Sequence, residues 1–213
     1  MTQGLRGVIL AAMQTLGLSG ESKRSDGRLK SIFWPTVENA WDVNYLGEQG
    51  FWILIAVAVF ELAVSALTGN TVVMISGIVT FFVYVMGAMG VREANWPAAA
   101  MVFSVYFAGM LGTLAMGRLP GVIAVIIAGV LLSNVRAAFL ASEWKPLDEN
   151  EDRPTRFNET LADKFSDQLP AKLWPKIQIP FFALASVLLL LELVGLGTAL
   201  VQRFGILHTH LRP

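Results

Sequence analysis

The sequence has no cysteine, only two histidines, and charges on only 15% of its 213 residues. Without cysteine there are no disulfides, no thiolate metal sites and no cysteine nucleophile. A soluble domain carries charge on about 25% of its residues, so this composition excludes an ordinary water-soluble enzyme. Basic and acidic residues number 16 each, which leaves no net field to attract nucleic acid.

Motifs for catalysis and cofactor binding are missing as well. The sequence contains no HExxH, no GxSxG and no P-loop. His208 and His210 lie in the last six residues, so no histidine is available to hold a haem or activate a serine within an apolar segment. The His-Thr-His pair is interpreted either as part of an unstructured tail or as a pair of metal ligands on an exposed tail. We expect no cofactor.

What is present in quantity is apolar sequence. Five long stretches contain none of the basic residues and only two of the acidic ones; they are residues 51–68, 71–91, 98–117, 119–135 and 177–202. About 20 apolar residues in a helix cross the hydrocarbon core of a bilayer. The stretches do not alternate between apolar and polar residues, as the strands of a membrane β-barrel do.

These stretches predict an all-α membrane protein with a bundle of five transmembrane helices. Short links after the first three spans favour antiparallel neighbours. The predicted divisions are a cytoplasmic N-terminal part with interfacial helices, four spans, a cytoplasmic loop, a fifth span and an external tail. They cover residues 1–50, 51–142, 143–176, 177–202 and 203–213.

Basic residues predict the orientation of the bundle. Thirteen of the 16 lysines and arginines fall in the N-terminal part, the link at Arg92 and the large loop, which the positive-inside rule places in the cytoplasm. In this topology every tryptophan falls near the cytoplasmic interface: Trp34, Trp41, Trp52, Trp96, Trp144 and Trp174. They form either a one-sided aromatic belt or a platform that docks a partner.

Three further segments have the periodicity of interfacial amphipathic helices. The first is residues 5–18. The second begins at Pro35 and contributes the apolar residues Val37, Ala40, Trp41 and Tyr45. The third, over 157–169, places Phe157, Leu161, Phe165 and Leu169 four apart and is expected to end at Pro170.

One set of oxygen ligands has the spacing of a calcium loop. Asp148, Asn150, Asp152 and Glu159 match positions 1, 3, 5 and 12 of an EF-hand. Arg153 replaces the glycine that this loop requires at its sharp turn, and a proline follows. The pattern therefore favours a solvated acidic turn, and no metal site is predicted.

Glu61 and Glu192 are the only charged residues in the five stretches. Ionisable residues in a span are costly and usually face the bundle interior. Each lies ten residues into a helix that runs outward, so both are expected near the middle of the membrane. They are interpreted as neutral acids bonded to a hydroxyl, as a proton or ion site, or as a contact with a lipid or substrate headgroup. The hydroxyl candidates are Thr80, Tyr84, Ser104 and Tyr106.

Rows of small residues predict close helix packing. One row consists of Ala100, Ser104, Ala108 and Gly112, and a second consists of Gly129, Ser133 and Ala137. The rows face each other or a neighbouring subunit. Asn134 lies beside the second row and is a candidate for a hydrogen bond between helices.

These observations predict a non-enzymatic protein of the bacterial inner membrane that serves as an accessory, assembly or scaffold component of a membrane complex. The alternative is a small proton- or ion-coupled carrier that uses Glu61 and Glu192. A membrane enzyme acting on lipid is third. The expected partners are the lipid bilayer and other membrane subunits, with no nucleic acid.

Overall fold

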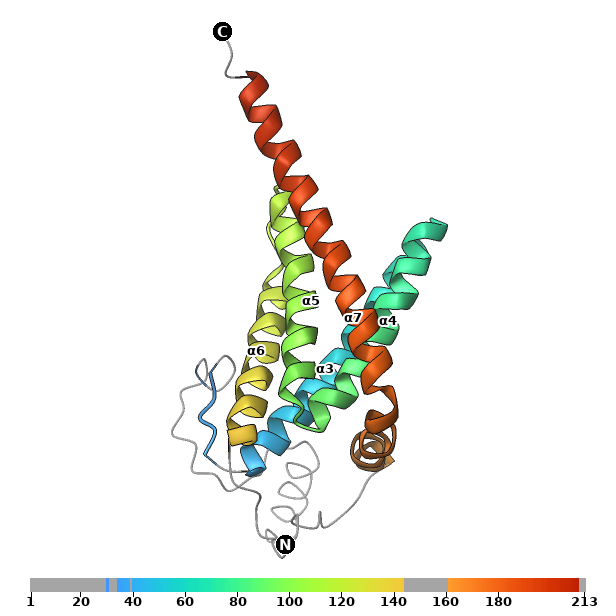
Figure 1. The fold of residues 1–213 in the computed structure, drawn as a ribbon, viewed down its shortest axis with the longest axis vertical. Helices are drawn as coiled ribbons and strands as arrows, with labels where there is room; N and C mark the ends of the chain where they lie inside the picture. The colour runs from blue at the N-terminus through green and yellow to red at the C-terminus, as the bar shows by residue number, and fades with distance from the viewer. Residues whose placement is uncertain (1–29, 31–33, 39, 144–160, 211–213) are drawn as a thin grey trace, which may run out of the picture.

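The computed structural model describes residues 30, 34–38, 40–143 and 161–210, and within them all regular structure is helical (Figure 1). The helices are α3 (Ala40–Leu67), α4 (Thr71–Arg92), α5 (Trp96–Ala115), α6 (Val122–Glu143) and α7 (Leu161–His210). Each contains a segment long and apolar enough to cross a membrane. The prediction of five apolar helices is therefore confirmed. The predicted helix over 5–18 lies outside the described residues.

Four helices form a ring, and the fifth packs on its outside. In the ring, α3 contacts α4 and α6, and α5 contacts the same two helices, while α7 lies against α4 and α5. Figure 1 draws the start of α3 and the end of α4 at the lower end of the bundle. The turns that join α3 to α4 and α5 to α6 lie at the upper end (Figure 1).

Each upper turn contains a glycine in the left-handed region, with φ of +65° at Gly69 and +81° at Gly117. L-residues with a side chain rarely adopt this conformation. Asn70 then starts α4, since its Oδ1 accepts hydrogen bonds from the backbone N–H groups of Val72 (2.9 Å) and Val73 (3.3 Å). Such N-caps satisfy donors that the first turn leaves open.

The predicted helix starting at Pro35 does not exist as a separate element. Residues 34–38 are not helical, and α3 begins at Ala40 and runs without a break into the first span. The buried Asp42 accepts a hydrogen bond from the backbone N–H of Glu38 through Oδ2 (3.1 Å), which fixes the entry into the helix. The polar residues after Asp42 therefore extend the first span downward.

The fifth span also begins earlier than expected, because Pro170 does not end the amphipathic segment. α7 continues through Pro170, Pro175 and Pro180 and on to His210, past the predicted end at 202. Proline lacks the N–H that would bond to the carbonyl four residues earlier. For Pro170 that carbonyl belongs to Ser166, and it accepts a hydrogen bond from Nε of Arg92 instead (3.2 Å).

Side chains from α3, α4, α5 and α7 fill the core in the lower half of the bundle. The fully buried ones include Phe51, Leu54, Val83, Val102 and Phe181. Glycines on α4 allow this close packing: a Cβ atom at Gly90 would lie only 2.6 Å from Cη2 of Trp174. Small residues let helix backbones approach where lipid provides no hydrophobic drive.

Candidate functional site

Glu61 lies on the face of α3 that turns toward the core. Leu54 and Ala58 are fully buried, Glu61 follows at helical spacing, and Ser65 is buried one turn further on. Ser65 packs against Gly77 of α4, but Glu61 itself is exposed. The carboxylate therefore lies where α3 leaves the packed core.

Glu192 has the same position on α7. Phe181, Ala185 and Leu188 are buried at helical spacing, and Glu192 is the next residue of this stripe and is half-buried. Its carboxylate lies beside α5, since a Cβ atom at Gly109 would be 3.8 Å from Oε2 of Glu192. Both acids thus follow directly after the last buried apolar side chain of their helix.

Two tyrosines complete the group. Tyr84 of α4 is 5% exposed, and Tyr106 of α5 is half-buried. Glu61 lies within electrostatic range of Glu192 and of both tyrosine hydroxyls, and Glu192 lies within range of Tyr84. We call Glu61, Tyr84, Tyr106 and Glu192 the acid–tyrosine layer. Each member comes from a different helix.

The layer has unused hydrogen-bonding capacity. In the described part of the chain, neither the Glu61 carboxylate nor the Glu192 carboxylate forms an ion pair or accepts a hydrogen bond. Tyr106 donates to the backbone carbonyl of Ala124 (3.3 Å), whereas the Tyr84 hydroxyl bonds to no described residue. The hydroxyl of Ser104, another candidate partner, donates to its own helix at the carbonyl of Ala100.

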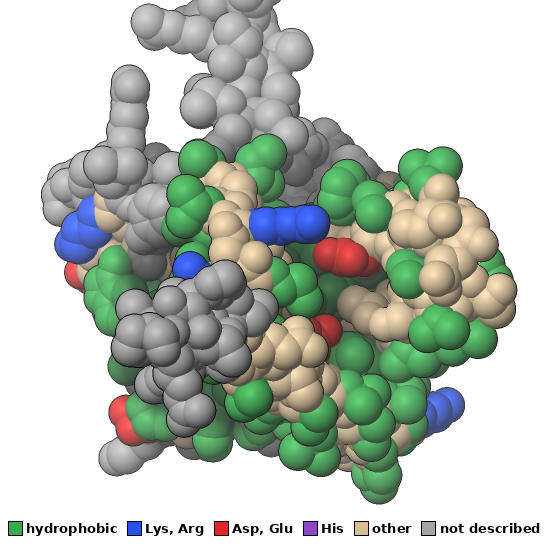
Figure 2. All heavy atoms as spheres, turned by 90° about the horizontal axis from the view of Figure 1, so that it is seen from above, with side chains coloured by type: hydrophobic (Ala, Val, Ile, Leu, Met, Phe, Trp, Pro, Cys, Tyr) green, Lys and Arg blue, Asp and Glu red, His purple; other side chains and the backbone are tan. Residues whose placement is uncertain are grey.

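Above the layer the helices separate. Every residue from 66 to 76, which forms the tip of the α3–α4 hairpin, is exposed. On the other side, Arg203 of α7 donates to the carbonyl of Leu114 (3.2 Å) and keeps α7 beside the end of α5. Figure 2, which looks down on the upper end, shows a hollow between two groups of helices, with acidic side chains on its wall and a basic side chain at its rim. We call this space the upper opening.

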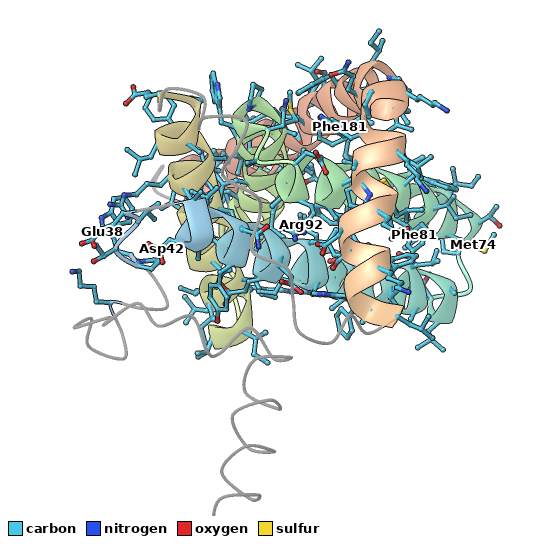
Figure 3. The ribbon with its side chains drawn as sticks, turned by 90° about the horizontal axis from the view of Figure 1, so that it is seen from below. Glu38, Asp42, Met74, Phe81, Arg92 and Phe181 are labelled. Carbon is cyan, nitrogen blue, oxygen red and sulfur yellow. The ribbon has the colours of Figure 1, made fainter. Side chains whose placement is uncertain are left out.

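The lower end is closed by polar contacts, most of them made by one residue that sequence reasoning used only for orientation. The guanidinium of Arg92 donates to Oδ1 of Asn44 on α3 (2.7 Å) and to the carbonyl of Ser166, and it forms an ion pair with Asp167 on α7. Figure 3 shows Arg92 between α3 and the first turns of α7, which cross the lower end. No sequence motif predicts these contacts of Arg92.

The tryptophans do not form one uniform surface. Trp34, Trp52 and Trp96 are exposed, whereas Trp174 is buried against Phe181 and Gly90. Trp174 therefore belongs to the core and cannot contribute to an exposed platform. The side chain of Trp41 and all of Trp144 lie outside the described residues.

The small residues pack unevenly. Ala108, Ser133 and Ala137 are buried, and Ala100, Ser104 and Gly129 are half-buried. A Cβ atom at Gly112 would meet nothing within 4 Å, so the upper end of the first row makes no close contact.

Asn134 does not bond to a neighbouring helix. It is 2% exposed, and its Nδ2 donates to the carbonyl of Val130 in its own helix (2.9 Å). Its Oδ1 lacks a donor within the described structure and packs on Gly50 of α3, where a Cβ atom would lie 2.6 Å away. Asn134 therefore fills the contact between α3 and α6.

The described residues contain no group of three or more histidine, cysteine or acidic side chains able to hold a metal ion. Asp148, Asn150, Asp152 and Glu159 lie outside the described residues. His208 and His210 fall within the last turns of α7, and their side chains are not described.

The fold and these contacts define a class: an all-helical integral membrane protein with a packed lower half and an acid-lined upper opening. No protein-family model, curated protein or solved structure matches the chain.

Proposed function

We propose that this protein is a non-enzymatic component of a membrane complex, with an accessory, assembly or scaffold role. The observation that carries the proposal is the exposure of Glu61 in an apolar span. A carboxylate facing hydrocarbon is costly, and such residues normally face protein or water. A subunit that covers the upper opening removes this cost.

Extraction under gentle conditions tests the proposal. Membranes are solubilised in a mild detergent, and the particle mass is compared with that of the 23.2 kDa chain in its micelle. We expect most of the protein in a larger particle that contains a second polypeptide at fixed stoichiometry. A particle containing one copy of this chain and no other polypeptide would contradict the proposal.

A second candidate is a proton- or cation-coupled carrier. It is supported by the acid–tyrosine layer, in which titratable side chains from four helices meet below an opening. A carrier needs such a group at membrane depth, together with access from both sides. The described structure supports access from the upper end only, because the core below the layer is packed.

Flux measurements separate the two candidates. Purified protein is reconstituted into liposomes that contain a pH-sensitive dye, and a potassium diffusion potential drives cations inward. A carrier gives proton flux that Glu61→Gln abolishes and that Glu143→Gln, at the exposed end of α6, preserves. The complex component gives no flux above empty liposomes with any of the three proteins.

We further propose that the protein lies in a bacterial inner membrane with its lower end in the cytoplasm. The support is the excess of lysine and arginine in the segments that adjoin the lower end. Because the chain has no cysteine, single-cysteine variants report directly on which side of the membrane the substituted residue lies. Labelling with an impermeant maleimide from outside is expected at Leu119→Cys, in an upper turn, and absent at Ser142→Cys. The reverse pattern would overturn the orientation.

A further inference from the structure

We propose that the upper opening receives a transmembrane helix of a different protein, which brings a lysine or arginine side chain to Glu61 and Glu192. This inference rests on the proposed function and specifies the site and the chemistry of the contact. The occupant is deduced from three properties of the opening: its charge, its unused hydrogen-bonding group and its apolar walls.

A partner that carries a cation complements the two acids of the site. Glu61 and Glu192 lie within electrostatic range of each other, and the five apolar stretches contain no lysine or arginine. A second copy of this chain would bring only further carboxylates to this depth. A lipid acyl chain would cover apolar side chains but leave the carboxylates without a polar partner. Charge complementarity therefore selects a different protein with a basic group in its span.

Tyr84 provides an independent observation. Its side chain is 5% exposed, its hydroxyl lies within electrostatic range of both carboxylates, and it bonds to none of the residues that the structure describes. The ring of Tyr84 is buried, whereas its hydroxyl oxygen is not among the buried atoms that lack a partner, so this oxygen is accessible to an incoming donor. We infer that a donor entering beside Glu61 and Glu192 also bonds to this hydroxyl oxygen, which can accept from an ammonium or guanidinium group.

The walls of the opening require an apolar helix around that basic residue. Phe60 and Val64 are exposed on α3 beside Glu61, and Leu191 and Val194 are exposed on α7 beside Glu192. At membrane depth a segment of the partner must satisfy its own backbone hydrogen bonds, which a helix does. The opening is hollow from above (Figure 2), which leaves room between the α3–α4 hairpin and α7.

A synthetic probe tests the inference without knowledge of the partner. The full-length protein, labelled at Leu119→Cys, is reconstituted into liposomes with a leucine-rich transmembrane peptide that carries one central lysine and an acceptor dye. A matched peptide has leucine in place of the lysine. Energy transfer measures association, and we expect the lysine peptide to associate roughly tenfold more strongly than the leucine peptide.

Variants locate the contact. Glu61→Gln and Glu192→Gln together are expected to abolish the preference for lysine, and Tyr84→Phe to reduce it by roughly half. Glu143→Gln, outside the opening, is expected to leave it unchanged. Equal association of both peptides with the wild-type protein would overturn the inference, and so would a preference that survives the double variant. A small-cation site gives the first of these results.

Failure of this inference is distinguishable from failure of the proposed function. If the native complex forms but the probe shows no preference for lysine, the protein is a complex component that docks elsewhere. If the protein is a single chain in gentle detergent, the proposed function itself fails. The two experiments use different samples, so one result does not determine the other.

Discussion

The lower and upper halves of this bundle are built from the same apolar helices, but their side chains pack differently. In the lower half, glycines allow close approach, and the guanidinium of Arg92 joins three helices. In the upper half, the α3–α4 hairpin stands apart, and the polar groups of Glu61 and Glu192 have no partner among the described residues. The two halves therefore differ in their charged groups: Arg92 is paired across helices in the lower half, whereas the two carboxylates at the base of the upper half are not, although Oδ1 of Asn134 in the lower half also lacks a donor within the described structure.

Removal of the Arg92 side chain is expected to give the largest effect on the lower half. Arg92→Ala removes the hydrogen bond to the Ser166 carbonyl beside Pro170 and the ion pair with Asp167. Loss of one partner of a largely buried charged network costs about 2–3 kcal/mol here, with allowance for the partial exposure of Asp167. Thermal unfolding in detergent measures the loss.

The matched control for Arg92 is Arg118→Ala. Arg118 is exposed in an upper turn, and its side chain contacts no polar group that the structure describes. The Arg118→Ala variant should unfold at the same temperature as the wild-type protein. If both variants lose equal stability, the contrast between the two halves is wrong.

Addition of a single methyl group sharpens the comparison, with a smaller effect. Gly90→Ala places a Cβ against Trp174 and Ala98 in the lower half, and overpacking of this kind costs about 1–3 kcal/mol. Gly112→Ala adds the same group where nothing lies within 4 Å, and alanine favours a helix over glycine by about 0.5–1 kcal/mol. Unfolding temperatures should shift in opposite directions. Shifts of the same sign would show that the two halves are packed alike.

The smallest effect is expected at the edge of the lower half. Arg136 of α6 donates to the carbonyl of Pro35 (2.7 Å) and lies 4.8 Å from the centre of the Trp34 ring. Arg136→Ala removes one hydrogen bond and one cation–π contact, together about 1 kcal/mol. We expect faster backbone hydrogen exchange over residues 34–38 and unchanged exchange in α4. Arg136→Lys retains the charge, and its exchange rate over residues 34–38 should lie between those of the wild-type protein and Arg136→Ala.

The sequence predicted the five apolar helices because hydropathy over some 20 residues is sufficient for that. It did not predict where α3 and α7 begin. The polar residues around Asp42 do not resemble a span, and Pro170 is a normal end signal for an isolated helix. Both helices extend because partners distant in sequence, above all Arg92, satisfy polar groups that local reasoning leaves open.

The sequence predicted the two acids of the candidate site, and it gave Tyr84 and Tyr106 only as two of four possible hydroxyl partners. Glu61 and Glu192 are conspicuous as charges in apolar runs, and their similar depth follows from helical rise. That Tyr84 and Tyr106 join them depends on which faces of α4 and α5 turn inward, and rows of small residues did not reveal this. Gly112 belongs to such a row and makes no close contact, whereas Gly90, outside the rows, is tightly packed.

The length of α7 also has a consequence for the bilayer. Its apolar stretch, residues 177–202, is about 39 Å of straight helix against a hydrocarbon core of about 30 Å. A tilted helix accommodates this surplus. Tilt carries the upper half of α7 away from the α3–α4 hairpin (Figure 1). We therefore expect the separation between α7 and the α3–α4 hairpin to depend on hydrophobic thickness, with a thicker membrane favouring a more upright α7 and a shorter distance between Glu192 and Glu61.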